Sequence, residues 1–282
     1  MQTPQTRRLA ALWRKNIAWP QEHGAWAFLL SPLAVGLAAG GGWPRGAGWL
    51  VLGALAAFFL RQPVTALVKV YAHRRPRRDL PAALFWAAVY ALVGLIAVIL
   101  LWREGAGYLL WLAAPGVPVF LWYLWLVAHR AERRRMDVEI VSSGVLALAA
   151  PAAVWLAAGR VTATGWALWL LLWFQAAASI VYAYARLEQR RWRTMPPLRQ
   201  RLRAAWRPLA YTTFNLAVVF VLSQSHRLPT WLWVPYAVQW AETCWGIWRP
   251  AVRATPRAIG VRQFIVSTLF TVLFIWAWLT GG

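Results

Sequence analysis

Two permanent cations stand inside an apolar run of the chain. Arg61 and Lys69 lie four residues on either side of Thr65, in a stretch that reads as a membrane-spanning helix, so the three side chains share one helical face. A charged side chain near the middle of a bilayer costs about 2.5–3.5 kcal/mol, so this face is expected to look into protein or water. Cations in such a place can bind a phosphate or a carboxylate. The spacing therefore predicts a cavity.

Three further residues are candidates for moving a proton. Glu22 and His23 open the first apolar run, within Pro20-Gln-Glu-His-Gly-Ala-Trp26, and the pKa of histidine lies near neutral pH. The alternative is that Glu22 only favours the first turn of a helix and that His23 anchors it at the interface. Glu242 is the most deeply placed acid, and its expected partner is Arg61 or Lys69. A purely structural ion pair is an equally good explanation of Glu242.

A metal site is not predicted. Asp137 and Glu139 stand two residues apart, so on a helix they point to different sides. The single cysteine, Cys244, excludes an internal disulfide and a cysteine metal cluster.

Composition places these residues in a membrane protein. The 282 residues are 61% hydrophobic and only 13% charged, and they include 23 Trp, which is more apolar surface than a soluble core can bury. The net charge of +22 could suggest nucleic acid. The basic residues, however, stand in short links between apolar runs, so membrane orientation explains them better and no nucleic-acid partner is expected. No removable signal peptide is expected.

The elements that position these residues are predicted to be membrane-spanning helices in an all-α bundle. Runs of about 20 apolar residues can cross a bilayer. Nine such runs fall near residues 24–40, 47–70, 80–102, 107–128, 138–159, 163–186, 207–225, 229–248 and 259–280.

The links between these runs alternate in charge, and the positive-inside rule puts the N-terminus in the cytoplasm and Gly282 outside. We therefore expect a single domain over 1–282 in a bacterial inner membrane, with a cytoplasmic segment at 1–20 and a basic cytoplasmic loop at 187–206. Residues 196–207 could lie on the anionic inner leaflet, or their arginines could only fix topology.

Polar residues concentrate in the cytoplasmic halves of the predicted helices, while the third and fourth runs read as an apolar wall. This pattern predicts a pocket that opens to the cytoplasm and ends in an apolar floor, rather than a through-pore. The expected lining residues are Arg61, Thr65, Lys69, Glu139, Ser143, Gln175, Ser179, Tyr182, Arg186, Asn215 and Gln239.

Short motifs resemble known families. Glu-His-Gly-Ala-Trp at the first run, Arg61-Gln-Pro and Asp137-Val-Glu139 are similar to the YwiC-like family of uncharacterised bacterial membrane proteins. The nine runs and basic links also resemble the UbiA superfamily of intramembrane prenyltransferases, over most of the chain. That resemblance implies a UbiA-like helical bundle and two Asp-rich motifs that bind magnesium and diphosphate. The chain departs from it there, since the aspartate positions of the first motif hold Lys69, Ala72 and Pro76.

Magnesium prefers anionic oxygens, so neither the metal nor another cofactor is expected here. The hypothesis is a pocket for an anionic amphiphile, such as an isoprenoid or quinone-related lipid, with Lys69, Arg61 and Arg186 as donors. As an enzyme the chain would be a degenerate or metal-independent transferase using Glu22, His23 and Glu242. The alternatives are a transporter or carrier, and a non-catalytic subunit or assembly factor with an unknown protein partner.

Overall fold

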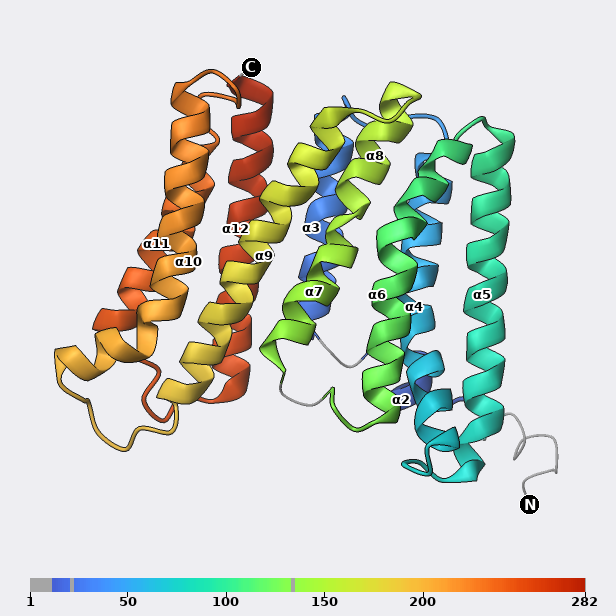
Figure 1. Cartoon of the computed structure of the whole chain (residues 1–282), viewed down its shortest axis with the longest axis horizontal. Coiled ribbons are helices and arrows are strands. Elements are labelled where there is room, and N and C mark those ends of the chain that lie inside the picture. The colour runs from blue at the N-terminus through green and yellow to red at the C-terminus, as the bar shows by residue number, and fades with distance from the viewer. Residues whose placement is uncertain (1–11, 21–22, 133–134, 282) are drawn as a thin grey trace.

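The computed structural model describes residues 12–20, 23–132 and 135–281, and this part of the chain contains helices and no strand. Figure 1 shows them as a broad bundle of mostly long helices. In chain order they are α2 (Lys15–Ala18), α3 (His23–Ala39), α4 (Ala47–Tyr71), η1 (Arg77–Asp79), α5 (Leu80–Arg103), η2 (Gly107–Leu112), α6 (Ala113–Ala128), α7 (Met136–Ala147), α8 (Ala149–Ala158), α9 (Ala163–Gln189), α10 (Leu198–Gln224), α11 (Trp233–Trp248) and α12 (Pro256–Thr280).

Seven helical segments of the described chain are long and apolar enough to cross a membrane, so this is a multi-pass membrane protein. α4, α9, α10 and α12 are each continuous. The other three segments join η1 to α5, η2 to α6, and α7 to α8. α3 and α11 are shorter, with 17 and 16 residues. Each of the nine predicted apolar runs coincides with a helix or a helix pair, and the count of nine membrane crossings stays a prediction.

The arginine-rich links gather at one end of the bundle. Figure 1 shows that the connections from α4 to α5, α6 to α7, α9 to α10 and α11 to α12 all lie at the end opposite the C-terminus. We call this the basic end. The arrangement is the one that the alternating charge of the links predicts, since every second link must return to the same side.

The helices form two groups joined by a central layer. α4, α5 and α6 lie on one side and α10 and α11 on the other, with α3, α7 and α8 between them (Figure 1). α9 and α12 pack against both the central layer and the second group.

Small residues let α3 and α8 approach closely in the central layer. Gly36 and Gly40 stand four residues apart on α3. A Cβ atom at Gly36 would lie 2.5 Å from the carbonyl oxygen of Ala150, and one at Gly40 would lie 2.8 Å from the Cβ of Ala157. Small residues at this spacing are typical of tightly packed membrane helices. The contact leaves no room for side chains between the two backbones.

Tryptophans of α9 hydrogen-bond to the backbone of α7. The indole nitrogens of Trp169 and Trp173 donate to the carbonyl oxygens of Gly144 and Ile140, each at 2.8 Å. The donors suit this place, because a polar group without a partner is costly in the hydrocarbon region. These two hydrogen bonds join the helices without using a charged side chain.

α10 begins earlier than the sequence predicts. The loop expected at 187–206 is reduced to residues 190–197, because α9 continues to Gln189 and α10 starts at Leu198. Pro208 lies inside α10, and Figure 1 shows the first turns of α10 directed away from the axis of the rest of the helix. A proline inside a helix removes one backbone hydrogen bond and favours such a bend.

Candidate functional site

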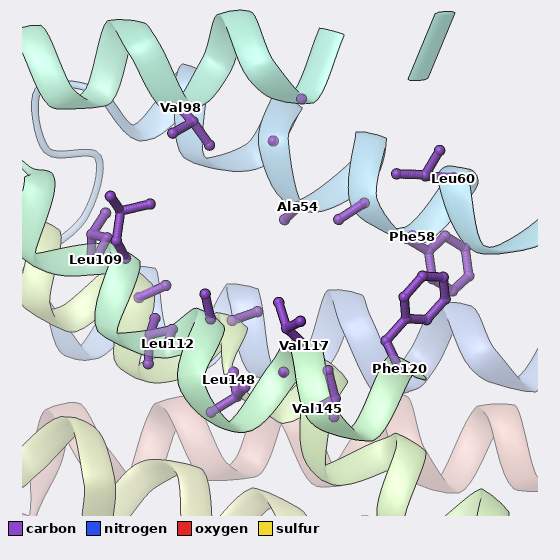
Figure 2. Close-up of a pocket in the computed structure, with 18 of the residues that line it drawn as sticks. Ala54, Phe58, Leu60, Val98, Leu109, Leu112, Val117, Phe120, Val145 and Leu148 are labelled. Atoms are coloured by element: carbon purple, nitrogen blue, oxygen red, sulfur yellow. The ribbon is translucent and has the colours of Figure 1, made fainter. Parts of the chain in front are cut away.

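A cavity of about 640 Å³ lies among α4, α5, η2, α6, α7 and α8, and Leu29 of α3 also lines it. Figure 2 shows its apolar lining, with Phe58 of α4, Val98 of α5, Leu112 of η2, Phe120 of α6 and Val145 of α7 among the side chains that face it. It is therefore formed by the first group of helices together with part of the central layer, and the third and fourth predicted runs supply much of its wall.

Small residues create this space. Gly53 and Ala57 of α4, Gly94 of α5, and Ala113 and Gly116 of α6 all line the cavity. A Cβ atom at Gly94 or Gly116 would meet its neighbours only at ordinary van der Waals distances, from 3.7 to 3.9 Å. The cavity thus exists because these positions carry little or no side chain where helices of a bundle normally interdigitate.

The polar lining residues lie toward the basic end. Arg61, Tyr90, Tyr123 and Ser142 are the charged and hydroxyl side chains among the described lining residues. The first three stand in the half of their own helices that is nearer the basic end, and Ser142 stands in that half of the segment formed by α7 and α8. The guanidinium carbon of Arg61 lies 5.3 Å from the centroid of the Tyr123 ring, within the range of a cation–π contact. The cavity is therefore graded, with a cation at one end and hydrocarbon beyond it.

The segment of residues 12–20 packs against α4 and α5 at this end. Three side chains donate hydrogen bonds to its backbone carbonyls: Tyr90 to Ala18 at 2.7 Å, Gln62 to Asn16 at 3.0 Å and Trp86 to Leu12 at 3.1 Å. Arg14 also forms an ion pair with Asp79. Tyr90 thus contacts both the cavity and this N-terminal segment.

The three residues predicted to share one helical face, Arg61, Thr65 and Lys69, have different partners in the structure. Arg61 lines the cavity, while the hydroxyl of Thr65 donates to the carbonyl oxygen of Arg61 at 2.7 Å. The Nζ atom of Lys69 lies 3.7 Å from Oε1 of Glu132, whose carboxylate also accepts from Nη2 of Arg74 at 2.8 Å. Lys69 does not line the cavity. The sequence does not single out Glu132, because one acid among the arginines of a link gives no indication that it is buried.

The neighbouring cations lower the pKa of the Glu132 carboxyl. Burial raises the pKa of Glu132, but the hydrogen bond from Arg74 and the charges of Arg74 and Lys69 outweigh burial and hold the pKa below its ordinary value. This cluster fixes the link between α6 and α7 against the end of α4.

Glu242 belongs to a separate cluster in the second group of helices. Its carboxylate accepts from Nε and Nη2 of Arg262 at 2.6 and 2.7 Å, and from the Tyr182 hydroxyl at 2.9 Å. The predicted partner, Arg61 or Lys69, is therefore wrong. The two cations are on α4, whereas α11 packs against α9, α10 and α12. The cluster joins α9, α11 and α12.

Arg186 caps a helix instead of facing the cavity. Its Nη1 atom donates to the carbonyl oxygens of Gly246 and Arg249 at 3.1 and 2.8 Å, and to Oε1 of Gln189 at 3.0 Å. Carbonyls at a helix C-terminus lack partners in their own helix and carry negative partial charge, so an arginine there is favourable. Arg186 thus stabilises the end of α11, and its expected role as an anion donor in the pocket is not supported.

The other predicted lining residues do not line this cavity, and most of them join helices to one another. Gln239 donates to the carbonyl oxygen of Gln175, and Asn215 to that of Phe174, at 3.0 and 2.9 Å. Ser143 donates to the carbonyl oxygen of Ile140 within α7.

Two of these residues pair with other side chains. The Tyr184 hydroxyl donates to Glu139 at 2.7 Å, and the Ser179 hydroxyl lies 3.5 Å from Oε1 of Gln263.

Glu22 and the side chain of His23 lie outside the described residues. In the part of the chain that is described, no three His, Cys, Asp or Glu side chains are grouped so that they could hold a metal ion.

No curated protein and no solved structure matches the chain. The family model described as YwiC-like protein matches residues 19–154, which include α3 to α7 and the first half of α8. This region contains every helix that lines the cavity. This region is therefore similar to the YwiC-like family, the resemblance that the motifs of the sequence predicted.

Proposed function

We propose that this membrane protein binds an anionic amphiphile, with the apolar part in the cavity and the anionic head at Arg61. The observation that carries the proposal is the gradient of the lining, which is apolar over most of its length and has Arg61, Tyr90 and Tyr123 toward the basic end. Ligand pockets commonly combine a largely apolar lining with a few convergent polar groups.

The dimensions suggest the size of the apolar part. A cavity of about 640 Å³ has room for roughly 20 methylene-sized groups, taking about 30 Å³ for each, the share of one water molecule. This fits a single isoprenoid or acyl chain better than a lipid with two long chains. An isoprenoid or quinone-related lipid, as a UbiA-like relationship would imply, stays within this range.

The head group should be a carboxylate or a phosphate. A guanidinium presents a planar fork of N–H donors that matches both groups, and the Tyr123 ring beside it limits its orientation. The Tyr90 and Ser142 hydroxyls are placed in the same lining and can add hydrogen bonds.

We further propose that the basic end faces the cytoplasm of a bacterial cell. Its support is the concentration of arginines in the links at that end. The head group would then lie toward the cytoplasmic leaflet, and the segment of residues 12–20 would cover the cavity from that side.

The proposal is one of binding and includes no reaction. Among the described lining residues none carries a carboxylate, an imidazole or a thiol. Glu242, the candidate acid of the second group, is held by Arg262 and Tyr182 away from the cavity.

Mass spectrometry of lipids retained by the purified full-length protein tests the proposal. The variant Arg61→Met removes the charge and keeps an apolar side chain of similar length, while Gly116→Leu adds a side chain to the cavity wall. Both should lose a single-chain anionic lipid that the wild type retains. Arg160→Gln, an exposed change at the opposite end, should retain it. Equal retention by the wild type and Gly116→Leu, or no retained anionic lipid in the wild type, would show that the cavity is not the binding site.

A further inference from the structure

The first turns of α10 form an amphipathic segment at the basic end. Leu198, Leu202 and Trp206 recur every four residues and are 43, 43 and 59% exposed. Each is followed by an exposed arginine, at 199, 203 and 207. Residues four apart lie on one face of a helix, so an apolar stripe runs beside a basic stripe. Such a helix suits the boundary between headgroups and acyl chains.

The segment is held in place by its opposite side. Ala205 and Pro208 are buried, and the Nη1 atom of Arg201 donates to the carbonyl oxygens of Ile247 and Trp248 at 3.1 and 3.2 Å. The exposed stripes are therefore presented on a fixed element rather than on a loose link. No carboxylate of the described residues pairs with the three exposed arginines.

A groove of about 280 Å³ adjoins this segment. It lies against α9, which packs on both α7 and α10. It is lined by the apolar residues Met136, Val181 and Ala210 together with Trp206, Arg207 and Tyr211. On α10, Arg203, Arg207 and Ala210 are spaced by four and three residues, so the basic stripe and the groove occupy the same face. The Arg207 guanidinium carbon also lies 5.5 Å from the centroid of the Trp206 ring.

We propose that this groove and the basic stripe bind an anionic phospholipid of the membrane leaflet at the basic end, with the phosphate held by Arg203 and Arg207. The groove has room for roughly nine methylene-sized groups, about the upper part of one acyl chain, at about 30 Å³ each. The site is separate from the cavity among α4 to α8, and it does not depend on the function proposed for that cavity.

The combination of features distinguishes a lipid site from arginines that only fix topology. Topology requires positive charge in the link but neither a groove nor an apolar stripe in register with the charge. Here the basic stripe, the aromatic residues Trp206 and Tyr211, and the apolar part of the groove lining converge within about two helical turns. Charge near an anionic surface contributes about 1 kcal/mol for each arginine, so two arginines correspond to a roughly 30-fold change in affinity.

The experiment is a titration of the purified full-length protein in detergent with phosphatidylglycerol or phosphatidylcholine of identical chains, with bound lipids counted by native mass spectrometry. The wild type should bind one phosphatidylglycerol in preference to phosphatidylcholine. The double variant Arg203→Gln/Arg207→Gln should weaken phosphatidylglycerol roughly 30-fold and phosphatidylcholine much less, because the choline cation of phosphatidylcholine already offsets the charge of its phosphate. Ala210→Trp, which fills the groove without changing charge, should weaken both lipids.

Two controls separate this site from general charge and from the cavity. Arg160→Gln/Arg227→Gln removes two exposed arginines from the opposite end, and Gly116→Leu fills the other cavity. Both should bind phosphatidylglycerol as the wild type does, and millimolar inorganic phosphate should not displace the lipid, because it lacks the chain. A wild type without headgroup preference overturns the proposal. So does an Arg203→Gln/Arg207→Gln variant that keeps the preference, or an Ala210→Trp variant that binds both lipids normally.

Discussion

The cluster of Glu242, Arg262 and Tyr182 makes a quantitative prediction about the second group of helices. The Glu242 side chain is only 11% exposed, whereas that of Arg262 is 42% exposed. Loss of Arg262 would leave the nearly buried Glu242 carboxylate without its cation, while loss of Glu242 would leave an arginine that is already accessible to water. The two substitutions should therefore differ in the free energy of unfolding, although they break the same ion pair.

The magnitudes follow from this asymmetry. Removing one partner of a fully buried pair costs about 3–5 kcal/mol. Glu242 keeps the hydrogen bond from Tyr182 at 2.9 Å, so Arg262→Met should cost about 2–3 kcal/mol. Glu242→Gln should cost only about 1 kcal/mol, because Arg262 can be hydrated and the amide oxygen still accepts from Tyr182.

The assay is unfolding of the purified protein by sodium dodecyl sulfate in mixed micelles, followed by circular dichroism. The double variant Glu242→Gln/Arg262→Met closes a thermodynamic cycle, and its loss should be well below the sum of the two single losses, because both remove one interaction. The reasoning is refuted if Glu242→Gln destabilises as much as Arg262→Met, or if the two losses simply add.

Three further predictions use the same unfolding assay. The pKa of Glu132 lies below its ordinary value of 4.5, so the stability from its ion pairs is complete above that value and is lost as pH falls through the lowered pKa. Glu132→Gln should therefore be less stable than the wild type by about 1–2 kcal/mol at pH 7, and the difference should shrink below pH 4.5; a constant difference would contradict this. Gly165→Ala would make its Cβ clash with Nε1 of buried Trp155 and should cost about 2 kcal/mol, while the control Gly48→Ala meets nothing within 4 Å and should cost nothing. Arg186→Met should cost about 2 kcal/mol by exposing the capped carbonyls of α11, and an unchanged unfolding midpoint would exclude the capping role.

The extents of the helices follow from the sequence because two strong signals agree. The bilayer sets the length of each apolar run, and the link arginines mark where it stops. The predicted run at 47–70 is observed as Ala47–Tyr71, and that at 107–128 as η2 and α6, Gly107–Ala128. α10 is the exception, since its first turns are amphipathic and a search for apolar runs does not recognise them.

The neighbours of each helix could not be predicted in the same way. Hydropathy shows which residues enter the membrane but not which helix lies beside which, so Glu242 was assigned to α4 cations rather than to Arg262. The polar side chains do not indicate this cavity, because it is formed mainly by residues that lack volume, such as Gly94 and Gly116. Only Arg61, among the predicted binding residues, lies in its lining.

The packing of α3 on α8 has a mechanical consequence for the cavity beside it. Where Gly36 and Gly40 bring two backbones together, no flexible side chain can yield, so that boundary is stiff. α5 is different, because its main neighbour is α4 and the side that does not line the cavity carries the exposed Leu92 and Ile99. A guest too large for the empty space would therefore push α5 outward into the surrounding lipid and leave the core of the bundle undistorted.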